Sequence, residues 1–198
     1  SGTLQLGNGG TTGSILGSVV NHGTLAINRS DSVVLANSIG GSGSVVNDGN
    51  GTLVLRGANT YSGGTTVNAG VLDVADDASL GAASGGVTLG GGALRASAGL
   101  TTRRDLNVTS GGGRIDTGTN IVGLQGSITG SGNLTKDGTG VLLIGGNNNF
   151  TGTTTIAQGE IALNAASLGA VSLAAGTRLS GTGTIRGNLV NAGMLTPG

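Results

Sequence analysis

Short aliphatic clusters separated by glycine-rich turns set the strongest limit on how this 198-residue chain can fold. Each cluster is a few residues long, and most alternate apolar and polar side chains, which is the pattern of a half-buried β-strand. Between the clusters lie Gly-Gly, Asn-Gly, Asp-Gly and Ser-Gly steps, which supply the positive φ angles of tight turns. Clear examples of the clusters are residues 3–6, 24–27, 52–55, 71–74, 87–89, 105–108, 141–144, 160–163 and 171–173.

Helices are not expected. No stretch has a convincing period of 3.6, and the nearest, residues 76–80, is too short for more than one helical turn. With 44 glycines and 9% charged residues the composition could indicate disorder. However, 36% of the residues are hydrophobic, the mean hydropathy is +0.21, and the apolar residues fall in strand-like clusters. These features favour an ordered β protein.

An internal repeat organises the chain. Residues 39–75 align without gaps onto residues 128–164 at an offset of 89, with 14 of 37 positions identical. The shared skeleton is Gly-Ser-Gly, Asp-Gly-x-Gly, a strand, Gly-x-Asn-x-aromatic, Gly-x-Thr-Thr and a second strand. The two aromatic residues, Tyr61 and Phe150, occupy the same repeat position. Self-similarity of this kind is typical of stacked, solenoid architectures.

A parallel β-helix fits this pattern better than a sandwich, whose strands would have to be longer. With roughly 20 residues per coil, the chain would form about nine or ten coils. At about 4.8 Å per coil, they would make a rod roughly 45 Å long. We expect its narrow interior to hold Val, Leu, Ile and Ala without aromatics. Tyr61 and Phe150 are therefore expected to pack as caps over turns at the edge of the helix.

Two segments, residues 51–72 and 132–142, closely resemble the passenger-associated transport repeat of autotransporters, the type V secreted proteins of Gram-negative bacteria. Residues 2–31 and 187–198 are similar to other coils of such passengers. The resemblance implies a right-handed β-helix stalk at the cell surface or outside the cell. It also implies anchoring at the outer membrane through a C-terminal translocator barrel, and an N-terminal signal. In the family the repeat is associated with efficient secretion and folding of the passenger.

We therefore expect residues 1–198 to be a single β-helix fragment of a longer passenger. The absence of cysteine excludes a disulfide scaffold, a zinc finger and thiol catalysis. A formal net charge of zero argues against electrostatic binding to nucleic acid or anionic membranes. The glycine clusters at residues 85–86 and 90–92 lack the Gly-Lys-Ser/Thr ending of a phosphate-binding loop.

Catalytic candidates are few. A Ser-His-Asp triad would need His22, the only histidine, with Asp31 as the nearest acid in sequence. The Asn21-His22-Gly23 context instead indicates a turn. Glycoside or pectate chemistry on a β-helix needs two or three acids on one face, often with Arg or Ca²⁺. The sets that could supply them are Asp73, Asp76 and Asp77, or Asp105 and Asp116 with Arg103, Arg104 and Arg114.

Other short matches favour structural roles. Asp48 and Asp137 recur in the repeat and are interpreted as structural, and the nine carboxylates, Glu160 among them, are expected mainly in surface and turn roles. Residues 111–116 match a calcium β-roll repeat only once, although that fold needs tandem copies. Residues 72–74, Leu-Asp-Val, match an integrin-type tripeptide at the level expected by chance.

The sequence thus predicts no catalytic, cofactor-binding or metal-ligating residues, and a chain that is not an enzyme. The favoured function is a structural passenger stalk that supports outer-membrane secretion, folding and surface display. The first alternative is an adhesion or self-association module, since low charge and exposed Thr and Asn permit contact between rods. The second is a carbohydrate-active enzyme, which requires the carboxylates above to converge. Expected partners are the translocator barrel, a second copy or a host surface, without nucleic acid or a small-molecule substrate.

Overall fold

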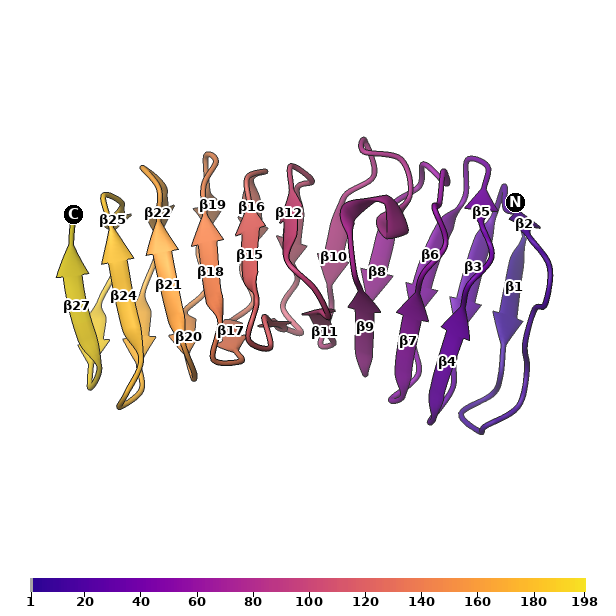
Figure 1. Ribbon diagram of the computed structural model, residues 1–198, viewed down its shortest axis with the longest axis horizontal. Helices are drawn as coiled ribbons and strands as arrows, with labels where there is room; N and C mark the ends of the chain where they lie inside the picture. The colour runs from indigo at the N-terminus through magenta and orange to yellow at the C-terminus, as the bar shows by residue number, and fades with distance from the viewer. Residues whose placement is uncertain (1) are drawn as a thin grey trace.

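Short parallel strands stacked in successive coils make up the whole computed structural model, which describes residues 2–198 (Figure 1). Every strand pair within these residues is parallel and in register. The termini lie at opposite ends of the stack. The predicted all-β solenoid of about nine to ten coils is confirmed, and its right-handed sense stays a prediction.

Three long sheets run along the rod, and successive strands of each coil belong to different sheets. The first sheet holds β1 (Thr3–Leu6), β3 (Thr24–Ile27), β6 (Ser44–Asn47), β8 (Thr65–Val67), β10 (Val87–Leu89), β13 (Leu106–Val108), β16 (Ile128–Gly130) and β19 (Asn149–Phe150). The second holds β4 (Ser32–Leu35), β7 (Thr52–Leu55), β9 (Val71–Val74), β11 (Ala93–Ala96), β14 (Gly113–Asp116), β17 (Leu134–Asp137), β20 (Thr154–Ile156), β23 (Val171–Leu173) and β26 (Leu189–Asn191).

The third sheet holds β12 (Leu100–Thr102), β15 (Ile121–Leu124), β18 (Val141–Ile144), β21 (Glu160–Leu163), β24 (Arg178–Gly181) and β27 (Met194–Pro197). Two further pairs complete the coils at the ends of the rod: β2 (Val19–Val20) with β5 (Ile39–Gly40), and β22 (Ser167–Leu168) with β25 (Thr184–Ile185). Because equivalent strands begin about 20 residues apart, the sheets grow by one rung per coil, although not every coil has a strand in all three sheets.

The core is one continuous apolar column inside the coils. On β7, for example, Leu53 and Leu55 point inward and are 1% and 0% exposed, whereas Thr52 and Val54 are half-buried. The same alternation recurs from strand to strand, and the buried cluster extends from Leu6 to Leu179. Burial of apolar surface drives the stacking, at about 25 cal/mol per Å².

Both aromatic side chains lie in this core, so the prediction that they cap turns at the edge was wrong. Tyr61 is 0% and Phe150 5% exposed. Glycines make the room: a Cβ at Gly81 would lie 3.0 Å from the Tyr61 ring, and one at Gly152 would lie 2.8 Å from Cζ of Phe150. An aromatic ring therefore fits inside a narrow coil where the neighbouring residue has no side chain.

Among residues 2–198 the one helical turn is the 3₁₀ turn η1 (Asp77–Leu80), at the place where the sequence allowed no more than a single turn. Asp76 caps it, because its Oδ1 accepts a hydrogen bond from the N–H of Ala78 at 2.7 Å. Within residues 2–198 there is no helix long and apolar enough to span a membrane.

The two repeat copies face different directions. In the first copy, β6 pairs with β8 in the first sheet and β7 with β9 in the second. In the second copy, β17 pairs with β20 in the second sheet and β18 with β21 in the third. The registers are equivalent: Val45 pairs with Thr65, and Leu134 with Thr154. An offset of 89 residues is not a whole number of coils, so the second copy is rotated by one face.

Candidate functional site

His22 lies in an exposed turn, and its ring Nδ1 is 3.2 Å from Oγ of Ser42. The acid proposed as its triad partner is engaged elsewhere, because both carboxylate oxygens of Asp31 accept hydrogen bonds from Arg29, at 2.8 and 2.7 Å. This pair also lowers the pKa of Asp31 through the hydrogen bond to Arg29. Among the described residues His22 thus contacts Ser42 but no acid that would orient its imidazole, and a triad is not assembled.

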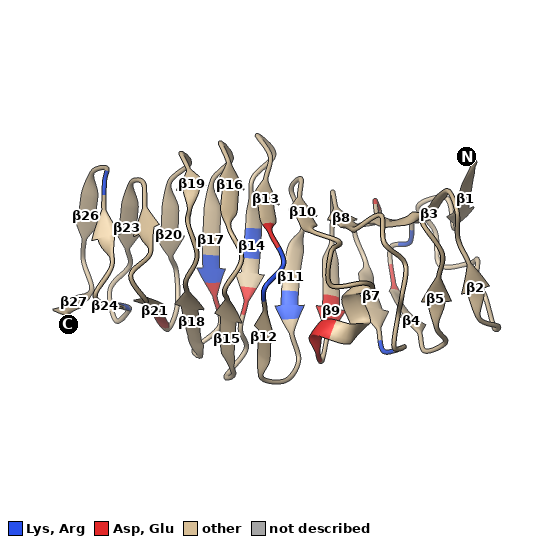
Figure 2. Ribbon diagram, turned by 90° about the horizontal axis from the view of Figure 1, so that it is seen from above, with Lys and Arg blue, Asp and Glu red and all other residues tan. Residues whose placement is uncertain are grey.

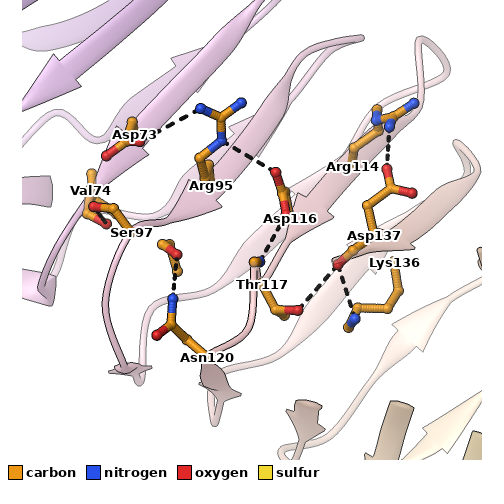
Figure 3. A network of polar contacts seen from close by, with 12 residues as sticks. Asp73, Val74, Arg95, Ser97, Arg114, Asp116, Thr117, Asn120, Lys136 and Asp137 are labelled. Carbon is orange, nitrogen blue, oxygen red and sulfur yellow. Dashed lines mark hydrogen bonds and ion pairs between the residues drawn. The ribbon is translucent and has the colours of Figure 1, made fainter. Parts of the chain in front are cut away.

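Many of the charged residues lie in the middle of the rod, on β9, β11, β14 and β17 and in the neighbouring loops (Figure 2). On the outer face of the second sheet, Asp73, Arg95 and Asp116 occupy consecutive rungs of one row. Arg95 lies between the two acids, 3.9 Å from Asp73 and 3.2 Å from Asp116 (Figure 3). Arg56 approaches Asp73 from the other side at 2.9 Å. In-register stacking places the side chains of paired positions on neighbouring strands close together. Charged residues in such a row must therefore alternate in sign to avoid repulsion.

The row continues to Asp137, which pairs in register with Asp116 and so would place two acids side by side. Arg114, on the same strand as Asp116, forms an ion pair with Asp137. Asp73 is only 7% exposed beneath its arginines, so the Leu-Asp-Val match at residues 72–74 is not an accessible ligand for a receptor. Asp116, the acid of the calcium-like match, binds Arg95 and accepts from the N–H of Gly118 at 2.9 Å.

A second cluster centres on Arg104, which is 5% exposed. Its guanidinium binds both carboxylate oxygens of Asp77, at 2.8 and 3.1 Å. It also donates to the carbonyls of Gly81 and Gly85, at 2.7 and 2.9 Å, and to that of Ala82. The Arg104 side chain therefore holds the loop that follows β9 in place through hydrogen bonds along its length.

The carboxylates proposed for glycoside chemistry are held in separate places. Asp73 and Asp116 belong to the ladder on the second sheet, whereas Asp77 belongs to the Arg104 cluster. Asp105 accepts from the N–H of Ser127 at 3.0 Å, and Asp76 caps η1. The other acids are also engaged: Asp48 accepts from Asn68 at 2.7 Å, and Glu160 binds Ser180. The proposed acids thus do not form one convergent site.

Lys136 is a buried charge that the sequence analysis did not single out. It is 0% exposed, and its Nζ donates to the carbonyls of Asp137, Gly138 and Gln158 at 2.9, 2.7 and 3.1 Å. Burial lowers the pKa of Lys136 to about 8, although the nearby charges of Asp137 and Asp116 oppose the shift. The strand alternation of residues 134–137 was the available signal, since it places Lys136 on the apolar side.

The repeat explains where Lys136 sits. The equivalent residue in the first copy is Asn47, which is 2% exposed and donates from Nδ2 to the carbonyl of Ala69 at 2.9 Å. Ala69 and Gln158 are themselves equivalent, so an amide in one copy and an ammonium in the other bridge equivalent pairs of adjacent coils. This residue pair has a structural role in both copies.

A second equivalent pair is Asn59 and Asn148, 5% and 8% exposed. Asn59 Oδ1 accepts from the N–H of Ile39, and Asn148 Oδ1 accepts from that of Ile128, both at 2.8 Å. Most buried polar groups in folded proteins are hydrogen-bonded. The invariant Asn of the Gly-x-Asn-x-aromatic skeleton therefore joins each coil to the preceding one.

Comparison with known proteins agrees with this geometry. The passenger-associated transport repeat model matches residues 45–74 and 134–163, which contain the paired strands of the two copies. The adhesin BmaC autotransporter of Brucella suis biovar 1 (strain 1330) is 40% identical over 131 residues. The chain thus contains two passenger-associated transport repeats and is similar to an autotransporter adhesin over the aligned part. The aligned segment covers 65% of this chain but only 4% of the relative. No solved structure matches the chain.

Proposed function

We propose that the chain is a stalk segment of a longer autotransporter passenger, displayed at the surface of a Gram-negative cell and joined to a C-terminal translocator barrel. Its role is structural rather than enzymatic. The rod holds other parts of the passenger away from the membrane, and its repeats help the passenger to fold as it emerges.

The rotation of the repeat copies by one face is the observation that carries this proposal. A binding surface built from both copies would require their outer faces to point the same way. Instead β6 and β17 lie in different sheets, while the internal bonds of Asn59 and Asn148 are retained. What the copies share is how one coil is attached to the preceding one. Such nearest-neighbour attachment allows a solenoid to fold by adding coils in sequence.

The test is deletion of residues 128–198 from the full-length passenger. The proposal predicts less passenger at the cell surface and a larger protease-sensitive fraction, with the barrel still inserted in the membrane. Unchanged secretion and unchanged protease resistance would overturn it.

A second candidate function is adhesion through self-association, favoured by one uncharged row on the first sheet. Its outward residues on consecutive rungs are Thr66, Thr88, Asn107, Thr129 and Asn149. They offer hydroxyl and amide groups without like-charge repulsion to a second copy of the rod. Sedimentation velocity across a concentration series tests this function: a saturable dimer weakened by N107D supports it, and a concentration-independent monomer contradicts it.

A further inference from the structure

Seven of the nine cationic side chains are held by partners within the described residues. Carboxylates or backbone carbonyls bind Arg29, Arg56, Arg95, Arg104, Arg114, Lys136 and Arg178. Within residues 2–198, Arg103 and Arg186 form no ion pair. Arg186 lies in the final coil, whereas Arg103 has described coils on both sides. The absence of a partner at Arg103 is therefore a property of the rod itself.

Arg103 lines an open hollow beside the loop that Arg104 ties down. The other lining residues are Asp77, Ala83, Thr101, Arg104 and Gln125. Asp77 is neutralised by Arg104, so the hollow retains the positive charge of Arg103. Because Thr102 pairs with Leu124, the residues that follow them, Arg103 and Gln125, lie on consecutive coils.

Two glycines keep the space around Gln125 open. A Cβ at Gly123 would lie 3.2 Å from Thr101 Oγ1 and 3.6 Å from Gln125 Nε2. A Cβ at Gly145 would lie 2.8 Å from Gln125 Oε1. Gly123 does not have a positive φ, so its backbone does not require glycine. The missing side chain instead leaves the hydroxyl of Thr101 and the amide of Gln125 accessible.

We propose that this hollow binds an oxyanion carried by an acidic glycan. A guanidinium binds carboxylate or sulfate oxygens through paired hydrogen bonds. The exposed hydroxyl of Thr101 and amide of Gln125 both donate and accept, which suits the hydroxyl groups of a sugar next to the anion. The site goes beyond the stalk function and does not depend on it.

Calorimetric titration of the purified chain at physiological salt tests the site with three probes: a heparin octasaccharide, a hyaluronan octasaccharide and inorganic sulfate. Heparin carries sulfates and carboxylates, whereas hyaluronan carries only carboxylates. Binding of heparin alone identifies a sulfate, and binding of both identifies a carboxylate. We expect R103Q to weaken glycan binding about tenfold or more, equivalent to about 1.4 kcal/mol. The uncharged changes Q125A and G123A should weaken it about threefold or more.

R186Q is the matched control, because it removes the other unpaired charge at a distant place. Site-specific binding predicts less than about a twofold effect for R186Q. Equal losses for R103Q and R186Q would show general charge attraction and overturn the proposal. It is also overturned if neither glycan binds, or if sulfate alone binds as tightly as the glycans. Unchanged thermal midpoints of the variants would show that they remain folded.

Discussion

Asn59 and Asn148, one in each repeat copy, make the same buried hydrogen bond to the backbone of the preceding coil. In each case an isoleucine N–H donates to the asparagine Oδ1 at 2.8 Å. The two residues lie on differently oriented parts of the rod, yet their local geometry is retained. The repeat is therefore best understood as a device for attaching coils, and the predictions below test its parts.

Removing this amide should weaken the coil junction. N148A leaves the N–H of Ile128 buried without its acceptor, which costs about 1–3 kcal/mol. Chemical denaturation of the purified chain measures the loss. The neighbouring exposed residue provides the control, since N147A should change the free energy of unfolding by less than about 0.5 kcal/mol. Equal effects of the two changes would contradict the role of Asn148.

The hydroxyl of Tyr61 makes a hydrogen bond that the equivalent residue Phe150, which has no hydroxyl, does not make. Tyr61 Oη lies 2.6 Å from Thr65 Oγ1, whereas the equivalent Thr154 Oγ1 is buried without a hydrogen-bond partner among the described residues. F150Y should therefore raise stability by about 1 kcal/mol, and Y61F should lower it by a similar amount.

T154V is the control for this pair, because it removes the unpaired hydroxyl while keeping the shape. It should be neutral or stabilising alone, and it should cancel the gain from F150Y. Thermal unfolding of the four variants gives the comparison. A loss of stability in F150Y would show that the second copy has no room for the hydroxyl.

Lys136 should make stability depend on pH. Its pKa is lowered to about 8 in the folded state, below the ordinary value of 10.5, so the unfolded chain binds more protons between these values. Stability should therefore rise with pH, by about 2 kcal/mol between about pH 7.5 and 9.5. Above about pH 10 Tyr61, whose pKa burial raises to about 12, would act in the opposite direction.

K136N carries the residue found at the equivalent position of the first copy, Asn47, and is the matched comparison. Urea midpoints of both proteins should be measured across the same pH range. The variant should lack the rise seen in the parent chain. If stability rises with pH equally in both proteins, the rise comes from a titratable group other than Lys136.

Arg104 should control the loop that follows β9. R104Q removes the ion pair with Asp77 and the bonds to the carbonyls of Gly81 and Gly85. Loss of a buried partner costs about 3 kcal/mol in many proteins, and proteolysis should begin in residues 77–85. R103Q changes the same charge at the adjacent exposed position and should leave the cleavage rate unchanged. Similar rates for the two variants would refute the role of Arg104.

The sequence predicted the coils because each strand repeats one simple rule. Alternation marked residues 52–55 as a half-buried strand, in which Leu53 and Leu55 point inward, and the strand and turn pattern indicated coils of about 20 residues. The same alternation placed Lys136 inward, but a charged residue contradicts the apolar expectation. One of the carbonyls that accept from Lys136 belongs to Gln158, in the next coil. This contact can be seen only once the register of the coils is known.

The interior position of Tyr61 was missed for a related reason. The expected narrow coil left no space for a ring, and the space depends on Gly81, which lies 20 residues later. The row of ion pairs on the second sheet could also not be predicted from the sequence. Asp73, Arg95 and Asp116 align only because the coil from Asp73 to Arg95 is one residue longer than the coil from Arg95 to Asp116. Sequence spacing alone does not fix such a register.

The most direct test of the coil-attachment account is the yield of folded passenger at the cell surface for the double variant N59A/N148A of the full-length protein. Surface labelling and protease resistance are compared with those of the parent and of N147A. The account predicts a clear fall in protease-resistant surface passenger for the double variant and none for N147A. Equal yields of resistant passenger from all three proteins would contradict it.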